Sequence, residues 1–455
     1  MTSPTETGLA GRRDGGVPRT RPLATDAVLG AARALRSTTV EVAPELLPDL
    51  VAVAGATDRR LWQHDGDALL GIGEALRIPL DGGLATRQGL LLVDRSLSEI
   101  SCDDPLCLPG TGPVAMGALP YDPAEPGHLC VPRLLVGRRT GRAWATLTEP
   151  ARASTHGGRQ ARAVQRSLAA LHQTTAGNEE PPDAFSLSAT LPHKRWREIV
   201  ANAVEEANAG RLTKVVVARR VDVTANRAFS LGQALRRLAA LYPSCAVFHI
   251  EGFIGASPET LVQRRGLDIF SFPLAGTVAR SGDQATDDAL VEALLASAKE
   301  RLEHKVVVDA IASTLRPWCA SLEVPAQPSV VPLRNVCHLG TLLHGVLPPT
   351  GALTSLEVAA ALQPTPAVGG IPQATALAWQ RANEGFSRGL YAGPVGWTDS
   401  RGDGAWAVGV RSADISGRRA SLYAGAGVVA GSDPEAELAE TQLKLQALLA
   451  ALVRP

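Results

Sequence analysis

The amino-acid sequence predicts an α+β protein with large antiparallel β-sheets. Its 455 residues are 45% apolar and 20% charged, and the formal net charge is zero. This is a globular composition, long enough for one large domain or for two to three ordinary ones. Short apolar segments punctuated by glycine are mixed with helical patterns, without the strict strand–helix–strand alternation that a parallel sheet requires.

The same composition argues against several classes of protein. A neutral chain lacks the electrostatic footprint of a protein that binds nucleic acid or an anionic membrane. No apolar run reaches the roughly 18 residues of a membrane span. Six cysteines without a Cys-x-x-Cys pair favour reduced thiols and a cytoplasmic protein. We therefore expect neither a nucleic-acid partner nor a membrane partner.

The first part of the chain is the less informative one. Residues 1–24, rich in Gly, Arg, Pro and Thr, are expected to be a disordered tail and not a signal peptide. Residues 25–188 form the N-terminal part of the fold, with a helix over 26–36, strands and turns to about residue 144, and a helix over 159–172. The polar, Pro-rich segment 173–182 (QTTAGNEEPP) is the best linker candidate.

Residues 189–452 contain the recognisable motifs and are expected to form the catalytic region. A helix over 193–208 has a continuous apolar stripe, and Gly210 stands where a C-terminal capping glycine belongs. The helix over 434–452 opens with Ser-Asp-Pro-Glu, a capping residue followed by proline and an acid in the first turn. Further elements are expected as strands over 214–219, 246–254, 391–397, 405–415 and 421–429, and as a long helix over 287–315.

Two of these helices each carry a Glu-x-x-Glu pair, Glu300/Glu303 and Glu437/Glu440. Residues three apart share a helix face, so each pair directs two carboxylates the same way. Four carboxylates turned toward one point need a cation, and Mg²⁺ prefers oxygen ligands. Either pair taken alone is more often an ordinary solvated helix face.

Period-two alternation predicts small residues on one face of two late strands. In the first strand this face carries Ala405, Ala407, Gly409 and then Arg411, and in the second it carries Gly425 and Gly427. Such faces leave room for a ligand, and an arginine beside them can grip a carboxylate. The alternative is that the small residues only permit close packing.

The order of the motifs resembles the chorismate-utilising enzymes, a family that includes isochorismate, salicylate, anthranilate and aminodeoxychorismate synthases. The resemblance spans about residues 214–444 and has weaker matches at GIG (71–73) and GALPYDP (117–123). It implies an anthranilate-synthase-like chorismate-binding fold: two packed antiparallel sheets with helices outside and the site between them. The matching segments are KVVVAR (214–219), GASPE (255–259), PLAGT (273–277), KERLEH (299–304), HLGT (338–341), PTPAVGGIP (364–372), GLYAGPVGW (389–397), GDGAWAVGVR (402–411), AGAGVV (424–429) and PEAELAET (434–441).

The resemblance implies a magnesium cofactor and a chorismate substrate. Glu303 and Glu440 would bind Mg²⁺ directly, and Glu300 and Glu437 would support it. The metal would hold the ring carboxylate of chorismate. The residues expected to contact the rest of the substrate are Arg411, Tyr391, Gly425 and Gly427 around the pyruvyl carboxylate, together with Thr277, His338, Ala367 and Lys444.

The resemblance also implies an acid–base pair. Lys214 would be the base that activates water to attack ring carbon C2, and Glu259 the acid that protonates the departing C4 hydroxyl. The chemistry needs both, because water is a poor nucleophile and hydroxide a poor leaving group. Without the resemblance, Lys214 would be an ordinary lysine at the start of a strand, and His338 would be a structural histidine.

Lys214 also bears on which member of the family this is. Ammonia-using members carry Gln at this position, so lysine argues for water as the nucleophile and against a glutaminase subunit. We expect a monomeric isochorismate synthase whose product feeds siderophore, menaquinone or salicylate biosynthesis. Salicylate synthase is the alternative, although Ala367 stands where several pyruvate-eliminating members have Thr. A phosphoryl-transfer enzyme should show a Gly-rich phosphate loop ending in Lys, and none is present.

Overall fold

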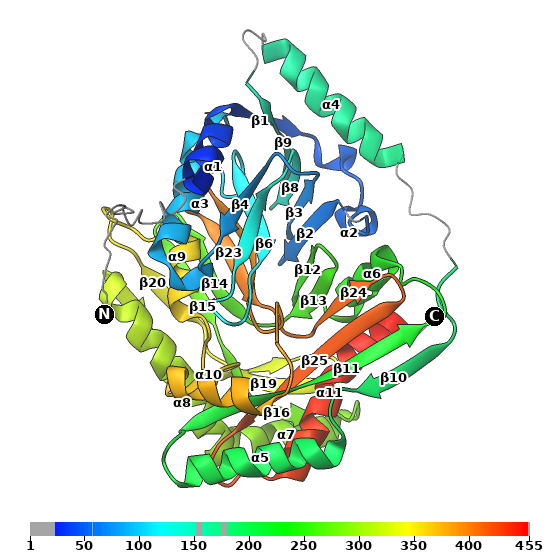
Figure 1. Ribbon diagram of the computed structural model, residues 1–455, viewed down its shortest axis with the longest axis vertical. Coiled ribbons are helices and arrows are strands. Elements are labelled where there is room, and N and C mark those ends of the chain that lie inside the picture. The colour runs from blue at the N-terminus through cyan, green and yellow to red at the C-terminus, as the bar shows by residue number, and fades with distance from the viewer. Residues whose placement is uncertain (1–22, 57, 152–156, 174–179, 454–455) are drawn as a thin grey trace, which may run out of the picture.

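The computed structural model describes residues 23–56, 58–151, 157–173 and 180–453. The predicted tail, residues 1–24, lies outside this range except for its last two residues, which begin helix α1 (Leu23–Arg33). Figure 1 shows a broad body in which helices surround long strands, as the α+β prediction requires.

The larger of two main sheets has thirteen strands, and all of its pairs are antiparallel except β1 with β5. Its order is β10 (Phe185–Ala189), β11 (Lys214–Ala225), β25 (Arg419–Val428), β24 (Ser412–Ser416), β13 (Phe253–Ser257), β12 (Ala246–Ile250), β2 (Arg59–His64), β3 (Asp67–Ile72), β8 (Leu134–Arg139), β9 (Arg142–Pro150), β1 (Leu35–Val42) and β5 (Ser101–Asp103), with β21 (Gly370–Ile371) paired to β11.

The second sheet has nine strands, and a third sheet of three strands lies near one end of the larger sheet. The nine-stranded order is β17 (Ser321–Glu323), β20 (Leu343–Val346), β15 (Asp268–Phe272), β14 (Thr260–Arg265), β23 (Gly404–Val408), β22 (Pro394–Asp399), β6 (Val114–Ala118), β7 (Gly127–Val131) and β4 (Leu76–Leu80). The small sheet is β16 (Leu274–Ala279), β19 (Val336–Gly340) and β18 (Ser329–Pro332).

Both main sheets combine strands from the two sides of segment 173–182. In the larger sheet β2 pairs with β12, and in the smaller one β6 pairs with β22. Gln173 ends helix α4, and residues 174–179 of the predicted linker lie outside the described range. The N-terminal part and the catalytic region therefore share their sheets.

Helices cover the outer faces of the sheets, and a core cluster lies between them. That cluster holds Trp62 and Leu69 of the larger sheet against Met116, Trp397 and Ala405 of the smaller one. Figure 1 places α5 and α11 beneath β11 and β25. The remaining helices are α2 (Leu50–Val53), α3 (Arg87–Glu99), α4 (Gly157–Gln173), α5 (His193–Asn208), α6 (Leu231–Leu241), α7 (Gln284–Ala296), α8 (Ala298–Leu315), α9 (Ser355–Leu362), α10 (Gln373–Asn383) and α11 (Pro434–Val453).

Several predicted elements keep their place but change their bounds. Helix α5 spans the predicted residues, and Gly210 after it has φ +70°. The helix predicted over 287–315 is two helices, because Ser297 is extended and its side chain caps α8 at the amide of Glu300. The strand predicted over 246–254 is a hairpin that turns at Glu251 and Gly252, both at positive φ.

The strand predicted over 405–415 is also two strands, and they belong to different sheets. The chain leaves the smaller sheet at the end of β23 and joins the larger one at β24. Between them Arg411 has φ +50°, a left-handed conformation that breaks the extended run. The strand predicted over 391–397 begins only at Pro394, so Tyr391 precedes it.

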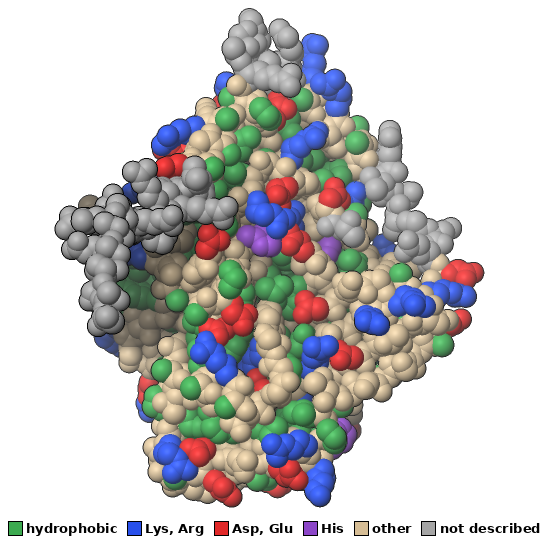
Figure 2. Space-filling view, in the orientation of Figure 1, with side chains coloured by type: hydrophobic (Ala, Val, Ile, Leu, Met, Phe, Trp, Pro, Cys, Tyr) green, Lys and Arg blue, Asp and Glu red, His purple; other side chains and the backbone are tan. Residues whose placement is uncertain are grey.

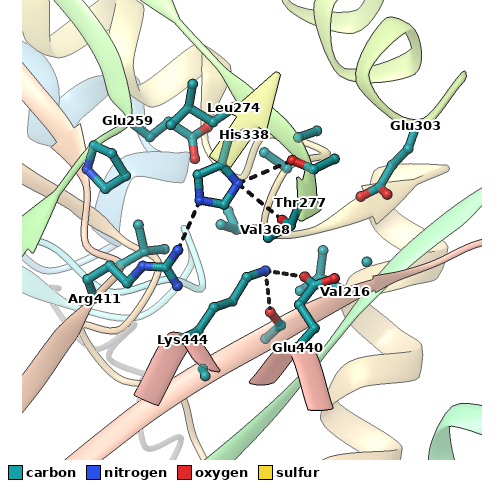
Figure 3. Close-up of a pocket in the computed structure, with 18 of the residues that line it drawn as sticks. Val216, Glu259, Leu274, Thr277, Glu303, His338, Val368, Arg411, Glu440 and Lys444 are labelled. Atoms are coloured by element: carbon teal, nitrogen blue, oxygen red, sulfur yellow. Dashed lines mark hydrogen bonds and ion pairs between the residues drawn. The ribbon is translucent and has the colours of Figure 1, made fainter. Parts of the chain in front are cut away.

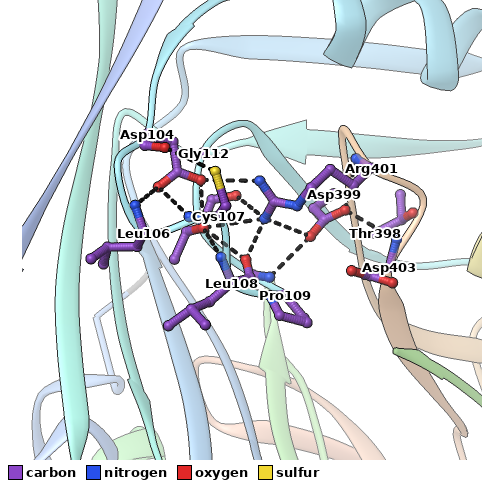
Figure 4. A network of polar contacts seen from close by, with 12 residues as sticks. Asp104, Leu106, Cys107, Leu108, Pro109, Gly112, Thr398, Asp399, Arg401 and Asp403 are labelled. Atoms are coloured by element: carbon purple, nitrogen blue, oxygen red, sulfur yellow. Dashed lines mark hydrogen bonds and ion pairs between the residues drawn. The ribbon is translucent and has the colours of Figure 1, made fainter. Parts of the chain in front are cut away.

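A network around Arg401 fixes the β22–β23 turn against the loop that follows β5 (Figure 4). The guanidinium contacts Asp104 Oδ2 over 3.0 Å and Asp399 Oδ2 over 3.2 Å. Asp399 also accepts a hydrogen bond from the amide of Gly110. These contacts hold one end of the smaller sheet, away from the pocket described below.

On the face seen in Figure 2, basic and acidic side chains are interspersed and do not gather by sign. None of the helices in the described part of the chain is both long and apolar enough to cross a bilayer.

Candidate active site

A pocket of about 660 Å³, including its opening to solvent, lies where the larger sheet, the small sheet and helices α8 and α11 meet. Figure 3 shows Glu303 and Glu440 on one side of it and Glu259 and Arg411 on the other. Residues far apart in the sequence line it. Those predicted from the sequence are Glu259, Thr277, Glu303, His338, Ala367, Tyr391, Arg411, Gly425, Gly427, Glu440 and Lys444.

The remaining three predicted residues, Lys214, Glu300 and Glu437, stand directly behind this lining. Lys214 Nζ lies 2.9 Å from Glu303 Oε1. Glu300 accepts a hydrogen bond from the amide of Thr277 over 3.2 Å. Glu437 is buried on the same helix as Glu440.

For the two alanines of the small-residue face predicted over 405–411, the alternative of close packing is the one that holds. Ala405 and Ala407 pack into the core between the main sheets, away from the pocket. Arg411 reaches the pocket because the chain bends between β23 and β24, and not because it continues their alternation. Gly425 and Gly427 both lie on the stretch of β25 that forms the pocket floor, and their contact with a substrate stays a prediction.

The two glycines leave space that a side chain would fill. A Cβ on Gly427 would stand 2.3 Å from Glu303 Oε1 and 3.1 Å from Lys214 Cε. A Cβ on Gly425 would stand 2.8 Å from a methyl group of Val216 and 3.1 Å from the hydroxyl of Tyr391. Glycine at these positions therefore lets side chains from β11, α8 and the Tyr391 loop converge on one site.

The four glutamates are near one another, but each faces its own partner. Lys214 contacts Glu303, Lys299 donates to Glu437 over 3.1 Å, and Lys444 donates to Glu440. Burial, followed by the charge of Glu440, raises the pKa of Glu437 to about 7. Burial and then Glu303 raise the pKa of Glu300.

This donor set fits a divalent cation. Carboxylate oxygens are the ligands that Mg²⁺ prefers, and burial and then a neighbouring glutamate raise the pKa values of Glu300 and Glu437. As the side chains stand, no three His, Cys, Asp or Glu side chains in the described ranges form a ready metal cage. Glu303 and Glu440 line the pocket and would hold the ion, which requires them to turn from their lysines.

Lys214 is 1% exposed at the start of β11, so the partial burial expected from the sequence is nearly complete. Its ammonium is within ion-pair distance of Glu303, and Nζ has no hydrogen-bond partner among the described residues. A buried lysine with unused hydrogen-bonding capacity is well suited to contact a small polar reactant.

Glu259 is buried in the connection between β13 and β14. Burial raises the pKa of its carboxyl to about 8, against the opposing charges of Lys214 and Lys444. At neutral pH it is therefore a protonated acid that can donate a proton.

His338 and Arg411 form a hydrogen-bonded pair in the pocket wall. Thr277 and His338 are opposite each other across the β16–β19 pair. His338 Nδ1 is 3.2 Å from the carbonyl oxygen of Gly276, to which it donates, and Arg411 Nη2 donates to His338 Nε2 over 3.0 Å. Burial and then the charge of Arg411 lower the pKa of His338 well below its usual value, so the ring is neutral and orients the guanidinium.

Tyr391 is buried beside Arg411 at the pocket. Burial raises the pKa of its phenol to about 12, so the hydroxyl stays protonated and can donate to a carboxylate. Its ring stacks on that of Tyr423 with centroids 5.1 Å apart.

Tyr423, Val368 and Lys299 belong to the site but were not predicted. Tyr423 and Val368 line the pocket, and Lys299 pairs with Glu437. Period-two spacing along β25 puts Tyr423 on the face of Gly425 and Gly427, so the pattern could have identified it. Val368 offers no such signal, because its role comes from the path of an irregular loop.

Comparison with known proteins gives a consistent result. The profile of the chorismate binding enzyme family matches residues 33–453. Isochorismate synthase DhbC of Bacillus subtilis is 42% identical over 266 residues, which cover 55% of this chain and 67% of that protein. The structure of MenF, the menaquinone-specific isochorismate synthase of Escherichia coli, superposes with a TM-score of 0.76 at 26% identity, covering 95% of this chain and 99% of that one.

Anthranilate synthase component I of Streptococcus pneumoniae shares the fold, with a TM-score of 0.67 at 21% identity over 90% of this chain and 98% of that one. The predicted anthranilate-synthase-like architecture is thus confirmed. The profile match covers nearly the whole described chain, in agreement with the motif order and the converging site. This chain belongs to the family of chorismate-binding enzymes.

Proposed function

We propose that this protein is an isochorismate synthase, which adds water at C2 of chorismate and releases the C4 hydroxyl. One observation carries the proposal: the buried carboxyl of Glu259 lines the pocket, and the buried ammonium of Lys214 contacts Glu303 in the lining of the same pocket. The family membership supplies the substrate class. Isochorismate synthases are among the relatives that this chain matches over most of their length.

The acid and the base divide the reaction between them. Lys214 removes a proton from water as the oxygen bonds to C2. Glu259 gives its proton to the C4 oxygen, which leaves as water while the ring double bonds shift. One water molecule enters and one leaves, so chorismate and isochorismate are isomers. The proton gained by Lys214 and lost by Glu259 is returned through solvent.

The binding residues hold the two carboxylates of the substrate. Arg411, oriented by His338, and the hydroxyl of Tyr391 would take the pyruvyl carboxylate, with the amides of Gly425 and Gly427 adding donors. Bound Mg²⁺ would neutralise the ring carboxylate beside Glu303 and Glu440. Glu300 and Glu437 would support the two metal-binding glutamates from behind.

Lys214 supports water and not ammonia as the nucleophile, so the enzyme is expected to act without a glutaminase subunit. We expect a monomer, which size-exclusion chromatography with light scattering would test. Ala367 in the pocket wall supports a reaction that stops before pyruvate is lost.

A product assay tests the function. The protein is incubated with chorismate, with Mg²⁺ or with EDTA, and products are separated by chromatography while salicylate fluorescence is followed. Isochorismate in equilibrium with chorismate, formed only with Mg²⁺ and without pyruvate, is the expected result. Salicylate with stoichiometric pyruvate would make the protein a salicylate synthase, and no consumption of chorismate would refute both.

A further inference from the structure

The edge of β11 is left without a strand next to the catalytic lysine. On one side β11 pairs with β25 from Val215 to Thr224. On the other side it pairs with β21 at Lys214 and Val215 and with β10 only from Val221 onward. No strand in the described part of the chain covers the intervening edge, and its backbone groups need other partners.

Side chains supply those partners. Gln380 of α10 and Arg388 each donate to the carbonyl of Val216 over 2.9 Å. The carboxylate of Glu384 accepts from the amide of Ala218 over 2.8 Å. Trp196 of α5 donates to the carbonyl of Ala218 over 3.2 Å. These contacts replace the missing strand.

The same side chains hold the loop that precedes β21. Arg388 donates to the carbonyl of Val368 over 2.8 Å, and Gln380 to that of Gly369 over 3.0 Å. The amide of Val216 donates to Gly369 over 2.8 Å. Val216 and Val368 both line the pocket, so two of its walls are fastened to one set of side chains.

The network is buried and internally paired. Gln380, Glu384 and Arg388 are each at most 5% exposed. Arg388 forms an ion pair with Glu384 and lies over the ring of Tyr121, whose hydroxyl donates to Gln380 over 2.7 Å. None of the four lines the pocket; they act on it through the segments they hold and, for Arg388, through the ring of Tyr391, whose centroid lies 6.0 Å from the guanidinium carbon.

We propose that Gln380, Glu384 and Arg388 are positioning residues that fix the Lys214 strand relative to the Ala367–Val368 loop. Together they set where the base meets the substrate ring. Charged hydrogen bonds from a planar guanidinium are strongly directional, and a misplacement of about 1 Å can cost ~10²-fold in rate. The inference rests on the proposed function, because Lys214 is taken as the base.

The test compares Arg388→Lys and Gln380→Met with Arg264→Lys. Lysine keeps the charge beside Glu384 but cannot reach both carbonyls. Methionine, of similar size, removes the two hydrogen bonds that Gln380 donates and the one that it accepts from Tyr121. Arg264 is a matched control, since it is equally buried, donates to the carbonyls of Gly266 and Arg401, and lies outside the pocket. Chorismate consumption is measured for folded protein, together with amide hydrogen exchange in 214–220 and 365–371.

For Arg388→Lys and Gln380→Met we expect kcat to fall at least ~10-fold while KM for chorismate changes less than ~3-fold, because Arg411 and Tyr391 still bind the carboxylates. Exchange should rise in both segments. Arg264→Lys should leave all three quantities unchanged.

Unchanged kcat and exchange in the two test variants would overturn the inference. If Arg388→Lys does not fold, Gln380→Met decides. If the wild type consumes no chorismate, the proposed function fails. In that case, hydrogen exchange in segments 214–220 and 365–371 of the variants still shows whether Gln380 and Arg388 hold these segments in place.

Discussion

The ammonium nitrogen of Lys214 lies 2.9 Å from Oε1 of Glu303, so the proposed base contacts a proposed metal ligand. In the absence of a cation this pairing satisfies both charges within a buried site. Binding of a divalent ion by Glu303 would compete with the contact and leave Lys214 free for water.

Lys214→Ala is expected to abolish water addition while Mg²⁺-dependent chorismate binding persists. Removal of a general base typically costs ~10²–10⁴-fold in rate. Chorismate consumption reports the chemistry, and thermal stabilisation by chorismate with Mg²⁺ reports binding. Lys305→Ala is the control, because Lys305 is exposed and forms its ion pair with Asp309, one turn along the same helix. Full turnover by Lys214→Ala would refute the assigned mechanism.

Glu440→Ala is expected to raise the Mg²⁺ concentration needed for half-maximal activity by at least ~10-fold, since loss of groups around a metal costs ~10–100-fold in affinity. Mg²⁺ titrations of activity and of melting temperature both measure it. Glu435→Ala, five residues earlier on the same helix and exposed beside Arg197, should behave as wild type. A Glu440→Ala titration that overlays the wild-type curve would exclude this residue as a ligand.

Gly427→Ala is expected to impair catalysis more than stability. The added methyl would collide with Glu303 Oε1 and crowd Lys214 Cε, which are ends of side chains that can shift. We expect kcat to fall at least ~10-fold, with ~1–3 kcal/mol lost in unfolding free energy. Gly30→Ala is a control on open helix surface, with nothing within 4 Å of its Cβ. Wild-type kinetics in Gly427→Ala would contradict this prediction, because they would show that the pocket tolerates a side chain at this position.

Activity is expected to decline above about pH 8. The pKa of Glu259 is raised to about 8 by burial, so the acid loses its proton in this range and can no longer protonate the leaving hydroxyl. A pH profile of kcat measures the alkaline limb. Glu259→Gln should lower kcat by ~10²–10⁴-fold and remove that limb. An alkaline limb that persists in Glu259→Gln would assign it to another group.

The same carboxyl makes stability depend on pH. The pKa of Glu259 is 4.5 in the unfolded chain and about 8 in the folded one, so the folded state keeps the proton up to a higher pH. The unfolding free energy contributed by this group therefore falls between about pH 4.5 and 8, by on the order of 4 kcal/mol. Glu259→Gln has no titrating carboxyl and does not lose this stability. The difference between its melting temperature and that of the wild type should therefore increase from pH 5 to pH 8. A constant difference would contradict a raised pKa.

Much of the site could be predicted because its motifs sit in regular elements. Helical spacing in α8 and α11 identified the glutamate pairs, and alternation in β25 identified Gly425 and Gly427. The family resemblance added Lys214 and Glu259, which bear no local signature of their role. The structure places all of them in the lining of one pocket or directly behind it, and their catalytic roles stay predictions.

The features that could not be predicted from the sequence depend mostly on contacts between distant parts of the chain. No local pattern distinguishes one strand over 405–415 from two strands in different sheets, since the bend at Arg411 is imposed by tertiary contacts. The pairing of Lys299 with Glu437 follows from how α8 and α11 meet, whereas Lys444 and Glu440 are four residues apart on α11 and pair within that helix. Gln380 and Arg388 have no motif at all, because their significance lies in an incomplete sheet edge at Val216, which is 164 and 172 residues earlier in the chain.

The mixing of distant strands in both main sheets has a consequence for protein synthesis. Strand β6 ends at Ala118, but its partner β22 begins only at Pro394. Translation of the intervening stretch takes on the order of 15–55 s at about 5–20 residues per second. Throughout that time β6, buried in the finished protein, has an unpaired edge on the ribosome. Chaperones that shield nascent chains should therefore influence the yield of active enzyme more strongly than its stability once folded.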